Sequence, residues 1–369
     1  MWRSGRWKPV PGHDRVSVRC GLVGLGYWTR SALLPALRAT PGTEIVACVG
    51  ATLAEAEAFA AELGIPRAFA TLADMLAAER LDLAIVATPD HVHAEAVEAL
   101  LAAGVAVYCE KPLANDGAAA ARLVALQHET GVAATVGYSF RFNPAIQALR
   151  RDLLAGRFGD IWLVELAEQN PQFHPHGKKP ANWKHDPAQA AGGALFEYGS
   201  HVIDMGAFLL GPITRVASSF RRVLPGARLD DIATLQLDFA SGAAGLLVSS
   251  WVLSGGFPGT RVKLHGSEAV GEVLLDHRLP GGQSYIVTPA FHPGSESPPL
   301  EPLGERQSDA AGRHIAAFVA SLSGGLPDPS LPTLAQAAHV QDVLAAALAA
   351  EHSWQSVSDH SPTSQSKES

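Results

Sequence analysis

The stretch that decides the fold is Val18-Arg-Cys-Gly-Leu-Val-Gly24-Leu-Gly26-Tyr-Trp-Thr29. Its first half is apolar and predicts a buried strand from Val18 to Val23. Two glycines then permit a tight turn, and a segment rich in alanine and leucine predicts a helix from Trp28 to Ala39. A strand that runs through a glycine turn into a helix begins a βαβ unit, and such units build parallel sheets.

The same alternation continues to about residue 136. We expect further strands at residues 44–49, 81–87 and 105–108, and helices at 53–63, 93–102 and 118–129. Thr52 is a predicted N-cap, and the segment Thr71-Leu-Ala-Asp74 has the form of a capping box. The alternation indicates a first domain, residues 16–137, built on a doubly wound parallel sheet.

After Gly137 the pattern changes. A helix at 144–155, a strand at 161–167, a polar loop at 170–191 and a helix at 194–209 come first. Period-two alternation without intervening helices then predicts strands at 215–223, 232–239, 243–251, 261–265 and 270–275, followed by helices at 310–323 and 334–350. This order predicts a second α/β domain, residues 138–352, with an open, mostly antiparallel sheet.

Composition excludes several classes of protein. The 369 residues are 47% hydrophobic and 17% charged, which suggests two soluble globular domains. A net charge of −8 argues against nucleic-acid binding, and no apolar run is long enough to span a membrane. Cys20, Cys48 and Cys109 form no Cys-x-x-Cys motif, so we expect reduced thiols and a cytoplasmic protein. Residues 1–15, which lack the apolar core of a secretory signal, and 353–369 are predicted to be disordered.

The glycine turn predicts a dinucleotide site. Gly24 permits the tight turn, and Gly26 would let the main chain approach a pyrophosphate at the helix N-terminus. Tyr27 and Trp28 follow directly and are included in this site, whereas Thr29 occupies the position usually taken by Gly or Ala. Any tight strand-to-helix turn could produce the motif alone, but its place in a βαβ unit favours the nucleotide.

The end of the second predicted strand bears on the choice between NAD and NADP. A carboxylate there would bind the ribose hydroxyls of NAD, but the strand runs into Gly50, Ala51 and Thr52. The absence of a carboxylate removes the repulsion against the 2′-phosphate of NADP, and small polar residues could donate to that phosphate. No arginine stands beside Gly50. Because the carboxylate is missing, the sequence favours NADP, with NAD as the alternative.

Two more segments follow strands at the same edge of the sheet. Thr88-Pro89-Asp90-His91 would flank the nicotinamide ribose, although Asp90 could equally be the N-cap of a plain turn. Glu110-Lys111-Pro112-Leu113 puts an ammonium group at the carboxyl edge, where α/β proteins bind ligands, and we include Glu110 and Lys111 in the nucleotide site. His91 and His93 have no carboxylate or cysteine partner at metal-ligand spacing, so we predict no metal site.

Together these segments resemble the Gfo/Idh/MocA oxidoreductase family. Three later segments extend the resemblance over residues 16–350: Gly137-Tyr-Ser-Phe-Arg-Phe-Asn-Pro144, Gly192-Gly-Ala-Leu-Phe-Glu-Tyr-Gly-Ser-His-Val-Ile-Asp204 and Val262-Lys-Leu-His-Gly-Ser-Glu268. The resemblance implies a Rossmann domain joined to an α/β domain whose sheet forms a homodimer or homotetramer. It also implies a pyridine nucleotide and a sugar, polyol or related cyclic substrate.

The resemblance also implies the catalytic groups. The family's lysine falls on Lys111, and its Asp-x-x-x-His pair falls on Glu197 and His201, with Glu in place of Asp. Lys111 would donate to the substrate oxygen, and His201 would exchange the hydroxyl proton. Glu197 shares a helical face with His201 and could orient the imidazole or bind a second hydroxyl. A core histidine that contacts a carbonyl is the alternative for His201.

Four neighbouring residues are open to structural interpretations. Arg141 is predicted to be a buried cation paired with a carboxylate, and Asp204 to form a salt bridge within its helix rather than to bind substrate. Trp183 and Lys184 resemble a Trp-Arg element of the family with Lys substituted. Trp183 could stack against a sugar or anchor its loop, and we include it with Lys111, Glu197 and His201 among the substrate-binding residues.

The leading hypothesis is an NAD(P)-dependent oxidoreductase that moves a hydride between the nicotinamide and a secondary alcohol or ketone of a sugar-like substrate. One alternative is a non-redox enzyme on the same scaffold that uses a held nucleotide to cleave a glycosidic bond. The other is a non-catalytic protein that senses NADP and binds a protein partner. The presence of both Lys111 and His201 disfavours the last.

Overall fold

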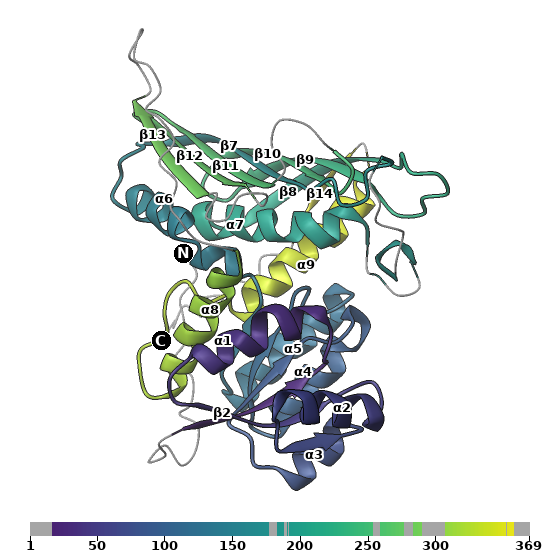
Figure 1. The fold of residues 1–369 in the computed structure, drawn as a ribbon. Helices are drawn as coiled ribbons and strands as arrows, with labels where there is room; N and C mark the ends of the chain where they lie inside the picture. The colour runs from purple at the N-terminus through teal and green to yellow at the C-terminus, as the bar shows by residue number, and fades with distance from the viewer. Residues whose placement is uncertain are drawn as a thin grey trace, which may run out of the picture.

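The computed structural model describes residues 17–176, 183–187, 190, 192–253, 259–276, 283–289, 307–351 and 353–357. Two β-sheets lie at opposite ends of the molecule with helices between them, as Figure 1 shows. The first predicted sheet and the second both form, and the α/β architecture is confirmed. Within the described ranges, no helix has the length and apolar character needed to cross a membrane.

The first sheet has six parallel strands in the order β3-β2-β1-β4-β5-β6. They are β1 Val18–Val23, β2 Thr43–Val49, β3 Arg67–Phe69, β4 Leu83–Val86, β5 Ala106–Cys109 and β6 Ala134–Val136. The order reverses between β1 and β4, and a reversal of this kind is where doubly wound proteins bind ligands. The three-residue strand β3 was not predicted, because it is too short to show periodicity.

Helices cover both faces of this sheet. They are α1 Leu34–Ala39, preceded by a π-helical segment Thr29–Leu33, then α2 Leu53–Leu63, α3 Leu72–Ala78, α4 His93–Ala102 and α5 Gly117–Thr130. Strand β4 shows why both faces are apolar: its alternate residues belong to two separate buried clusters. The ends of α2 and α4 lie where the sequence predicted them.

Side-chain caps fix the starts of two of these helices. Thr52 accepts the backbone N–H of Glu55 at 3.2 Å, as predicted. Thr71 accepts the N–H of Asp74 at 3.1 Å, but the Asp74 carboxylate accepts the Thr71 hydroxyl at 2.6 Å rather than the Thr71 backbone N–H. The capping-box prediction is therefore confirmed only for its first bond.

The second sheet has eight strands in the order β13-β12-β11-β7-β10-β9-β8-β14. They are β7 Ile161–Gln169, β8 Ile213–Arg221, β9 Ile232–Phe239, β10 Ala244–Ser250, β11 Gly259–Gly266, β12 Ala269–Asp276, β13 Gln283–Pro289 and β14 Trp354–Ser356. Among the described pairings between named strands of this sheet, only β7 with β10 is parallel, which confirms a mostly antiparallel sheet. Helices α6 Pro144–Leu154, α7 Ser200–Leu210 and α9 Leu334–Ala349 lie on its inner face (Figure 1).

Helix α8, Gln307–Leu322, does not follow the predicted domain division. Its residues Ile315 and Phe318 share a buried cluster with Leu33 and Leu37 of the first domain. Figure 1 shows α8 beside α1, on the side of the first domain. The division at residue 137 is therefore wrong for this helix. An amphipathic pattern predicts a buried face but does not reveal which surface covers it.

The predicted tail from residue 353 begins with a strand instead of a disordered segment. Trp354 to Ser356 pairs antiparallel with β8, and the Arg215 guanidinium lies 4.6 Å from the Trp354 ring. The segment is polar, and the strand forms because it pairs with β8, which lies far away in the sequence. Composition alone therefore did not predict it. Residues 358–369 and the predicted N-terminal arm lie outside the described residues.

His314 on α8 is buried without charge. Its Nε2 donates to the Thr135 hydroxyl at 3.0 Å, because that hydroxyl itself donates to the Pro332 carbonyl at 2.8 Å. Its ring stacks on Phe142 with the centroids 4.7 Å apart. Burial, with a smaller contribution from the Arg141 charge, lowers the pKa of His314 from 6.5 to about 3.

This lowered pKa predicts a loss of stability in acid. Below pH 6.5 the unfolded chain takes up a proton at His314 that the folded protein resists until about pH 3, so the free energy of unfolding falls between these values. The contribution at pH 5 is about 2 kcal/mol. Urea unfolding at pH 7.5 and pH 5 should show a smaller difference for His314→Gln than for the wild type. His128→Gln, exposed on α5, is the control, and an equal difference in all three proteins would contradict this prediction.

Candidate active site

The glycine turn between β1 and the first helix has the predicted geometry. Gly24 has a φ of 95°. A Cβ at this position would lie 2.5 Å from the carbonyl oxygen of Ala87, the residue that follows β4, so the turn requires glycine. A Cβ at Gly26 would meet nothing within 4 Å, so the main chain there faces open space at the start of the helix. The hydroxyl of Thr29 donates to the Gly24 carbonyl at 2.8 Å and closes the turn.

Lys111 lies directly after β5, at the carboxyl edge of the first sheet, and the peptide bond that follows it is cis. Its Nζ donates to the backbone carbonyl of Glu197 at 3.0 Å and to the Glu197 carboxylate at 3.3 Å. Only 13% of the lysine side chain is exposed. The fold thus brings into contact two groups that lie 86 residues apart in the sequence.

Glu110 and Trp28, both predicted to bind the nucleotide, contact each other. The Trp28 indole N–H donates to the Glu110 carboxylate at 2.9 Å, and the Tyr108 hydroxyl donates to it at 3.4 Å. A Cβ at Gly137 would lie 2.8 Å from the same carboxylate, so that glycine makes room for it. Burial raises the pKa of Glu110 even though Lys111 opposes the shift. Glu110 therefore supports the base of the site.

Glu197 lies between two lysines. One carboxylate oxygen accepts from Lys111, and the other accepts from Lys184. Burial alone would raise the pKa of Glu197, but the two ammonium charges outweigh it and hold the pKa well below its usual range. These bonds differ from both predicted roles of the carboxylate, which were to orient the His201 imidazole or to bind a second hydroxyl.

His201 lies in the first turn of α7, half-buried against the segment that follows β6. Its ring stacks on Phe140 with the centroids 4.4 Å apart, and it meets the Tyr138 ring edge-on at 6.0 Å. It lies close enough to Glu197 for its charge to help lower the pKa of that carboxyl group. Lys111, Glu197 and His201, the three predicted catalytic residues, thus lie in one part of the structure.

Arg141 and Asp204 form a buried ion pair. Arg141 has the carboxylate partner predicted for it, whereas the salt bridge of Asp204 does not lie within its own helix as predicted. Two nitrogens of the guanidinium donate to the two carboxylate oxygens at 2.8 and 2.5 Å, and both side chains are 1% exposed. A third bond, at 2.9 Å, joins Arg141 to Gln336 of α9. The pair fixes α7, which carries His201, to the segment that leaves the first domain.

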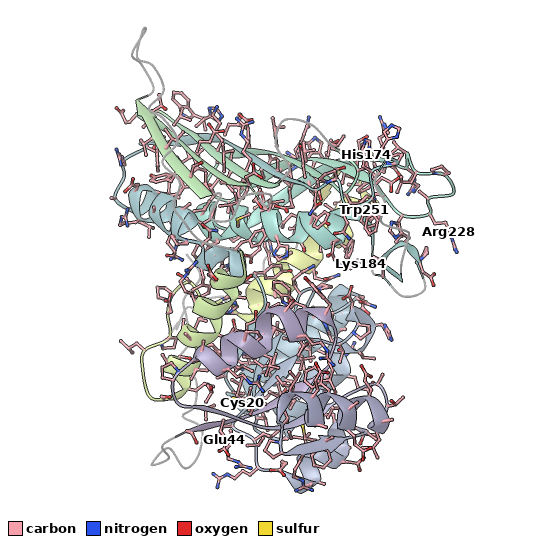
Figure 2. All side chains as sticks on the ribbon, viewed as in Figure 1. Cys20, Glu44, His174, Lys184, Arg228 and Trp251 are labelled. Atoms are coloured by element: carbon pink, nitrogen blue, oxygen red, sulfur yellow. The ribbon has the colours of Figure 1, made fainter. Side chains whose placement is uncertain are left out.

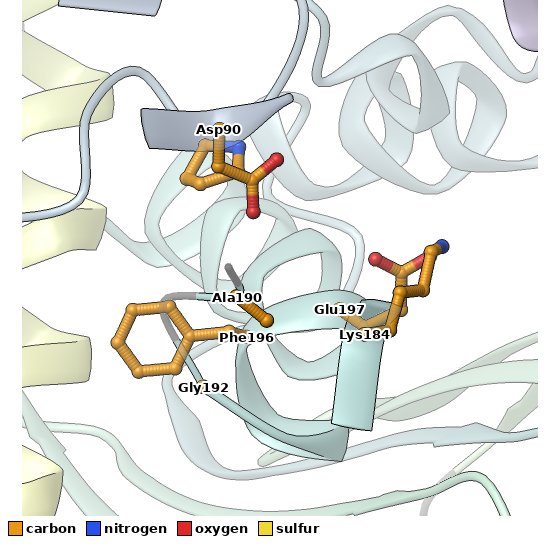
Figure 3. A pocket seen from close by; sticks show the side chains of 7 residues that line it. Asp90, Lys184, Ala190, Gly192, Phe196 and Glu197 are labelled. Atoms are coloured by element: carbon orange, nitrogen blue, oxygen red, sulfur yellow. The ribbon is translucent and has the colours of Figure 1, made fainter. Parts of the chain in front are cut away.

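A pocket of about 250 Å³, including space open to solvent, lies beside this group. It is lined by Asp90, Pro112, Lys184, Ala190, Gly192, Phe196 and Glu197. Figure 3 shows Asp90 on one side and Phe196, Glu197 and Lys184 on the other. Figure 2 places Lys184 on the part of the second domain that faces the first. Lys111 adjoins the pocket through its bonds to Glu197.

Three side chains have contacts that the sequence did not assign. Asp90, treated as a possible N-cap, lines the pocket. His93 holds two loops together, because its ring nitrogens lie 2.9 Å from the Thr88 carbonyl and 2.6 Å from the Pro112 carbonyl. Asp230 accepts the backbone N–H groups of Gly193 at 3.1 Å and of Leu195 at 2.8 Å.

The role of Asp230 follows from the position of the two backbone N–H groups that donate to it. Leu195 begins a π-helical segment, Leu195–Gly199, that contains Glu197 and continues into α7. A Cβ at Gly193 would collide with the Asp230 carbonyl, so only glycine fits there. Asp230 thus fixes the start of the helix that carries Glu197 and His201. The only sequence signal for it was a buried acid at the start of a strand, which identifies no partner.

The other predicted residues lie around the glycine turn or beyond it. Tyr27 is 83% exposed, and Pro89 and His91 are exposed next to Thr88. Trp183 lies in the short helix Trp183–His185, and its side chain lies outside the described part of the structure. Gly50, Ala51 and Thr52 form the turn from β2 into α2.

Comparison with known proteins agrees with this arrangement. A family model described as an oxidoreductase family with an NAD-binding Rossmann fold matches residues 18–138, and a Gfo/Idh/MocA C-terminal domain model matches residues 146–271. D-apiose dehydrogenase of Paraburkholderia graminis is 32% identical over 261 residues, which cover 70% of this chain and 68% of the relative. The chain belongs to the Gfo/Idh/MocA oxidoreductase family.

Two other known proteins match most of the chain. Myo-inositol dehydrogenase Hyg17 of Streptomyces leeuwenhoekii is 31% identical over 341 residues, which cover 91% of this chain and 95% of the relative. Levoglucosan dehydrogenase, solved in complex with NADH and L-sorbose, superposes with a TM-score of 0.82 over 94% of this chain and 100% of that chain, at 20% identity. This last likeness concerns the fold alone. The resemblance found in the sequence is therefore confirmed.

Proposed function

We propose that this protein is an NAD(P)-dependent dehydrogenase or reductase. It would move a hydride between the nicotinamide and a secondary alcohol or ketone of a sugar, polyol or related cyclic substrate. The observation that carries the proposal is the bond between Lys111, at the carboxyl edge of the first sheet, and Glu197, one turn before His201. This bond brings an ammonium, a carboxylate and an imidazole together beside the topological switch point.

The residues at the switch point fit a dinucleotide. The main chain at Gly26 faces open space at a helix N-terminus, which suits a pyrophosphate. The Thr88 hydroxyl, beside Gly24, has no hydrogen-bond partner among the described residues. We propose that the segments at Gly24, Gly50, Thr88 and Glu110 hold the nucleotide, NAD or NADP. When bound, the nicotinamide would supply the hydride acceptor or donor.

The charges of the site assign a role to each catalytic group. Burial opposes the charged form of Lys111, but the carboxylates of Glu197 and Asp90 outweigh burial and raise its pKa. Lys111 therefore stays protonated and donates to the substrate oxygen, where it stabilises alkoxide character. Glu197 stays ionised, and we assign it to positioning Lys111. His201 is left to accept the hydroxyl proton in oxidation and return it in reduction.

The pocket suits a polyhydroxylated substrate. Asp90, Lys184 and Glu197 offer both acceptors and donors to hydroxyl groups, and Phe196 and Pro112 give the pocket apolar wall area. Relatives named D-apiose dehydrogenase and myo-inositol dehydrogenase support a sugar or polyol in general. We also assign Trp183 to the substrate loop, in keeping with its position beside Lys184.

Two further parts of the proposal concern the protein as a whole. We propose a homodimer or homotetramer formed through the outer face of the second sheet, where Leu246 is 46% exposed among partly exposed apolar and charged side chains. We propose a cytoplasmic location, in keeping with three free and buried cysteines, Cys20, Cys48 and Cys109.

Nucleotide titration followed by a substrate screen tests the proposed function. NADH and NADPH should each be titrated against nicotinamide fluorescence, and polyols and aldoses should then be screened with the oxidised nucleotides. Net accumulation of reduced nicotinamide supports the proposal. A cleaved glycoside without net accumulation would favour the non-redox enzyme. Binding without turnover on any compound, with a protein partner captured in response to NADP, would favour the sensor.

A further inference from the structure

The end of β2 lies directly beside the glycine turn. The backbone N–H of Gly24 donates to the carbonyl of Val49, the last residue of β2, at 3.0 Å. Whatever follows Val49 therefore adjoins the site proposed for the dinucleotide. A carboxylate at this strand end accepts the hydroxyls of the adenosine ribose in NAD-binding Rossmann domains. Position 50 of this chain is a glycine and supplies none.

A carboxylate reaches this place from the next helix instead. Glu55, in the first turn of α2, accepts the backbone N–H of Ala51 through Oε2 at 2.8 Å. A Cβ at Gly50 would lie 3.2 Å from that same oxygen and 3.1 Å from the Ala56 nitrogen. The Glu55 carboxylate thus stands against the space that a side chain at position 50 would enter. Gly50 therefore leaves the space beside which the Glu55 carboxylate lies.

The contact is not an ordinary helix cap. In a capping box, the glutamate at the third helical position accepts the N–H of the N-cap residue, which here is Thr52. Glu55 instead bonds to Ala51, one residue earlier, which draws the carboxylate back toward the end of β2. Among the described residues, its other oxygen, Oε1, has no hydrogen-bond partner, and the side chain is exposed. One oxygen therefore holds the carboxylate in place, and the other can accept from a ligand.

The nearby basic side chain on the first helix is already occupied. Arg30 donates to Glu62 at 2.8 Å, and its guanidinium lies 4.5 Å from the Phe59 ring. The Arg30 guanidinium therefore contacts the Glu62 carboxylate and the Phe59 ring rather than the turn at Gly50. The charged group in contact with the Gly50 position is the Glu55 carboxylate, which attracts hydroxyl donors and repels a phosphate.

We propose that Glu55 accepts the hydroxyls of the adenosine ribose and makes the enzyme select NAD over NADP. This rests on the proposed nucleotide site. The selection is the opposite of the one that the sequence favoured. The sequence shows no acid at the end of β2, whereas in the structure the carboxylate of Glu55, five positions after Gly50, lies there. A 2′-phosphate would meet the Glu55 carboxylate as a like charge, and a free 2′-hydroxyl would donate to it.

Dissociation constants for NADH and NADPH, measured by fluorescence titration, test the inference without turnover. The wild type should bind NADH more tightly. Glu55→Gln keeps an acceptor for Ala51 but loses the charge, so it should weaken NADH binding by about tenfold and narrow the difference from NADPH. Glu57→Gln, an equal change of charge two residues along α2, is the matched control and should change neither constant.

Each other outcome is decisive. A wild type that prefers NADPH, or a Glu55→Gln variant with the wild-type ratio of the two constants, overturns the inference and leaves the proposed function standing. A wild type that binds neither nucleotide overturns the proposed function itself. Circular dichroism of both variants shows whether α2 is intact, and Glu55→Asp, which keeps the charge on a shorter side chain, should retain selection against NADPH even if NADH binds less tightly.

Discussion

Replacing Lys111 with methionine is expected to lower kcat by about 100- to 1,000-fold, the usual effect of removing one donor to a developing negative charge. Methionine keeps the length of the side chain but cannot donate to the substrate oxygen. The Gly24 turn is untouched, so the Kd for NADH should change little. Steady-state kinetics with the substrate found in the screen, together with nucleotide titration, measure the two effects separately.

The second lysine provides the control for charge. Lys184 also bonds to Glu197, so Lys184→Met removes one positive charge from the same carboxylate. If Lys111 acts by donating to the substrate, Lys184→Met should cause a clearly smaller loss of kcat. Equal losses in the two variants would mean that both lysines only neutralise Glu197. A Lys111→Met enzyme that kept more than about a tenth of the wild-type kcat would rule out the assigned role.

Replacing Asp204 with asparagine should lower the free energy of unfolding by about 3 to 5 kcal/mol, because it leaves the Arg141 charge buried without its partner. Both side chains are 1% exposed, so water cannot replace the lost carboxylate. Urea unfolding should show a lower midpoint with an unchanged m value. Since the pair fixes α7, kcat should fall as well, through displacement of His201.

An exposed ion pair is the control for burial. Glu62→Gln breaks the contact between Arg30 and Glu62, which are 41% and 60% exposed, and should cost no more than about 1 kcal/mol. The double variant Arg141→Met with Asp204→Leu removes both buried charges and should recover much of the stability lost by Asp204→Asn. A double variant less stable than the single one would show that the pair contributes more than mutual neutralisation.

The sequence predicted most secondary structure because those signals are local. The threonine cap of α2 and the alternating strands of the second sheet, such as Ile232–Phe239, are set by neighbours a few residues away. The π-helical segments Thr29–Leu33 and Leu195–Gly199 have the composition of ordinary helix, so no pattern announced them. The packing of α8 and the pairing of β14 depend on partners far away in the chain, which periodicity does not identify.

The candidate site divides in the same way. Lys111, Glu197 and His201 could be predicted because each lies in a motif that resembles the family, and Arg141 could be predicted to pair with a carboxylate because a buried cation requires an anion. The roles of Asp230 and Glu55 depend on which backbone N–H groups their carboxylates accept, and neither composition nor periodicity identifies those groups. The NADP expectation depended on the absence of an acid at the end of β2, whereas the carboxylate beside Gly50 comes from the first turn of α2.

The return of α8 to the first domain limits how the two halves of the enzyme can be separated. Ile315 and Phe318 complete a core that begins at Val18, so a fragment ending near residue 137 would expose the apolar surface that this helix covers and would be prone to aggregate. The chain crosses between the halves after β6 and again on either side of α8. If the two halves moved relative to one another, α8 would therefore stay with the first half, because its buried face belongs to the core of that half.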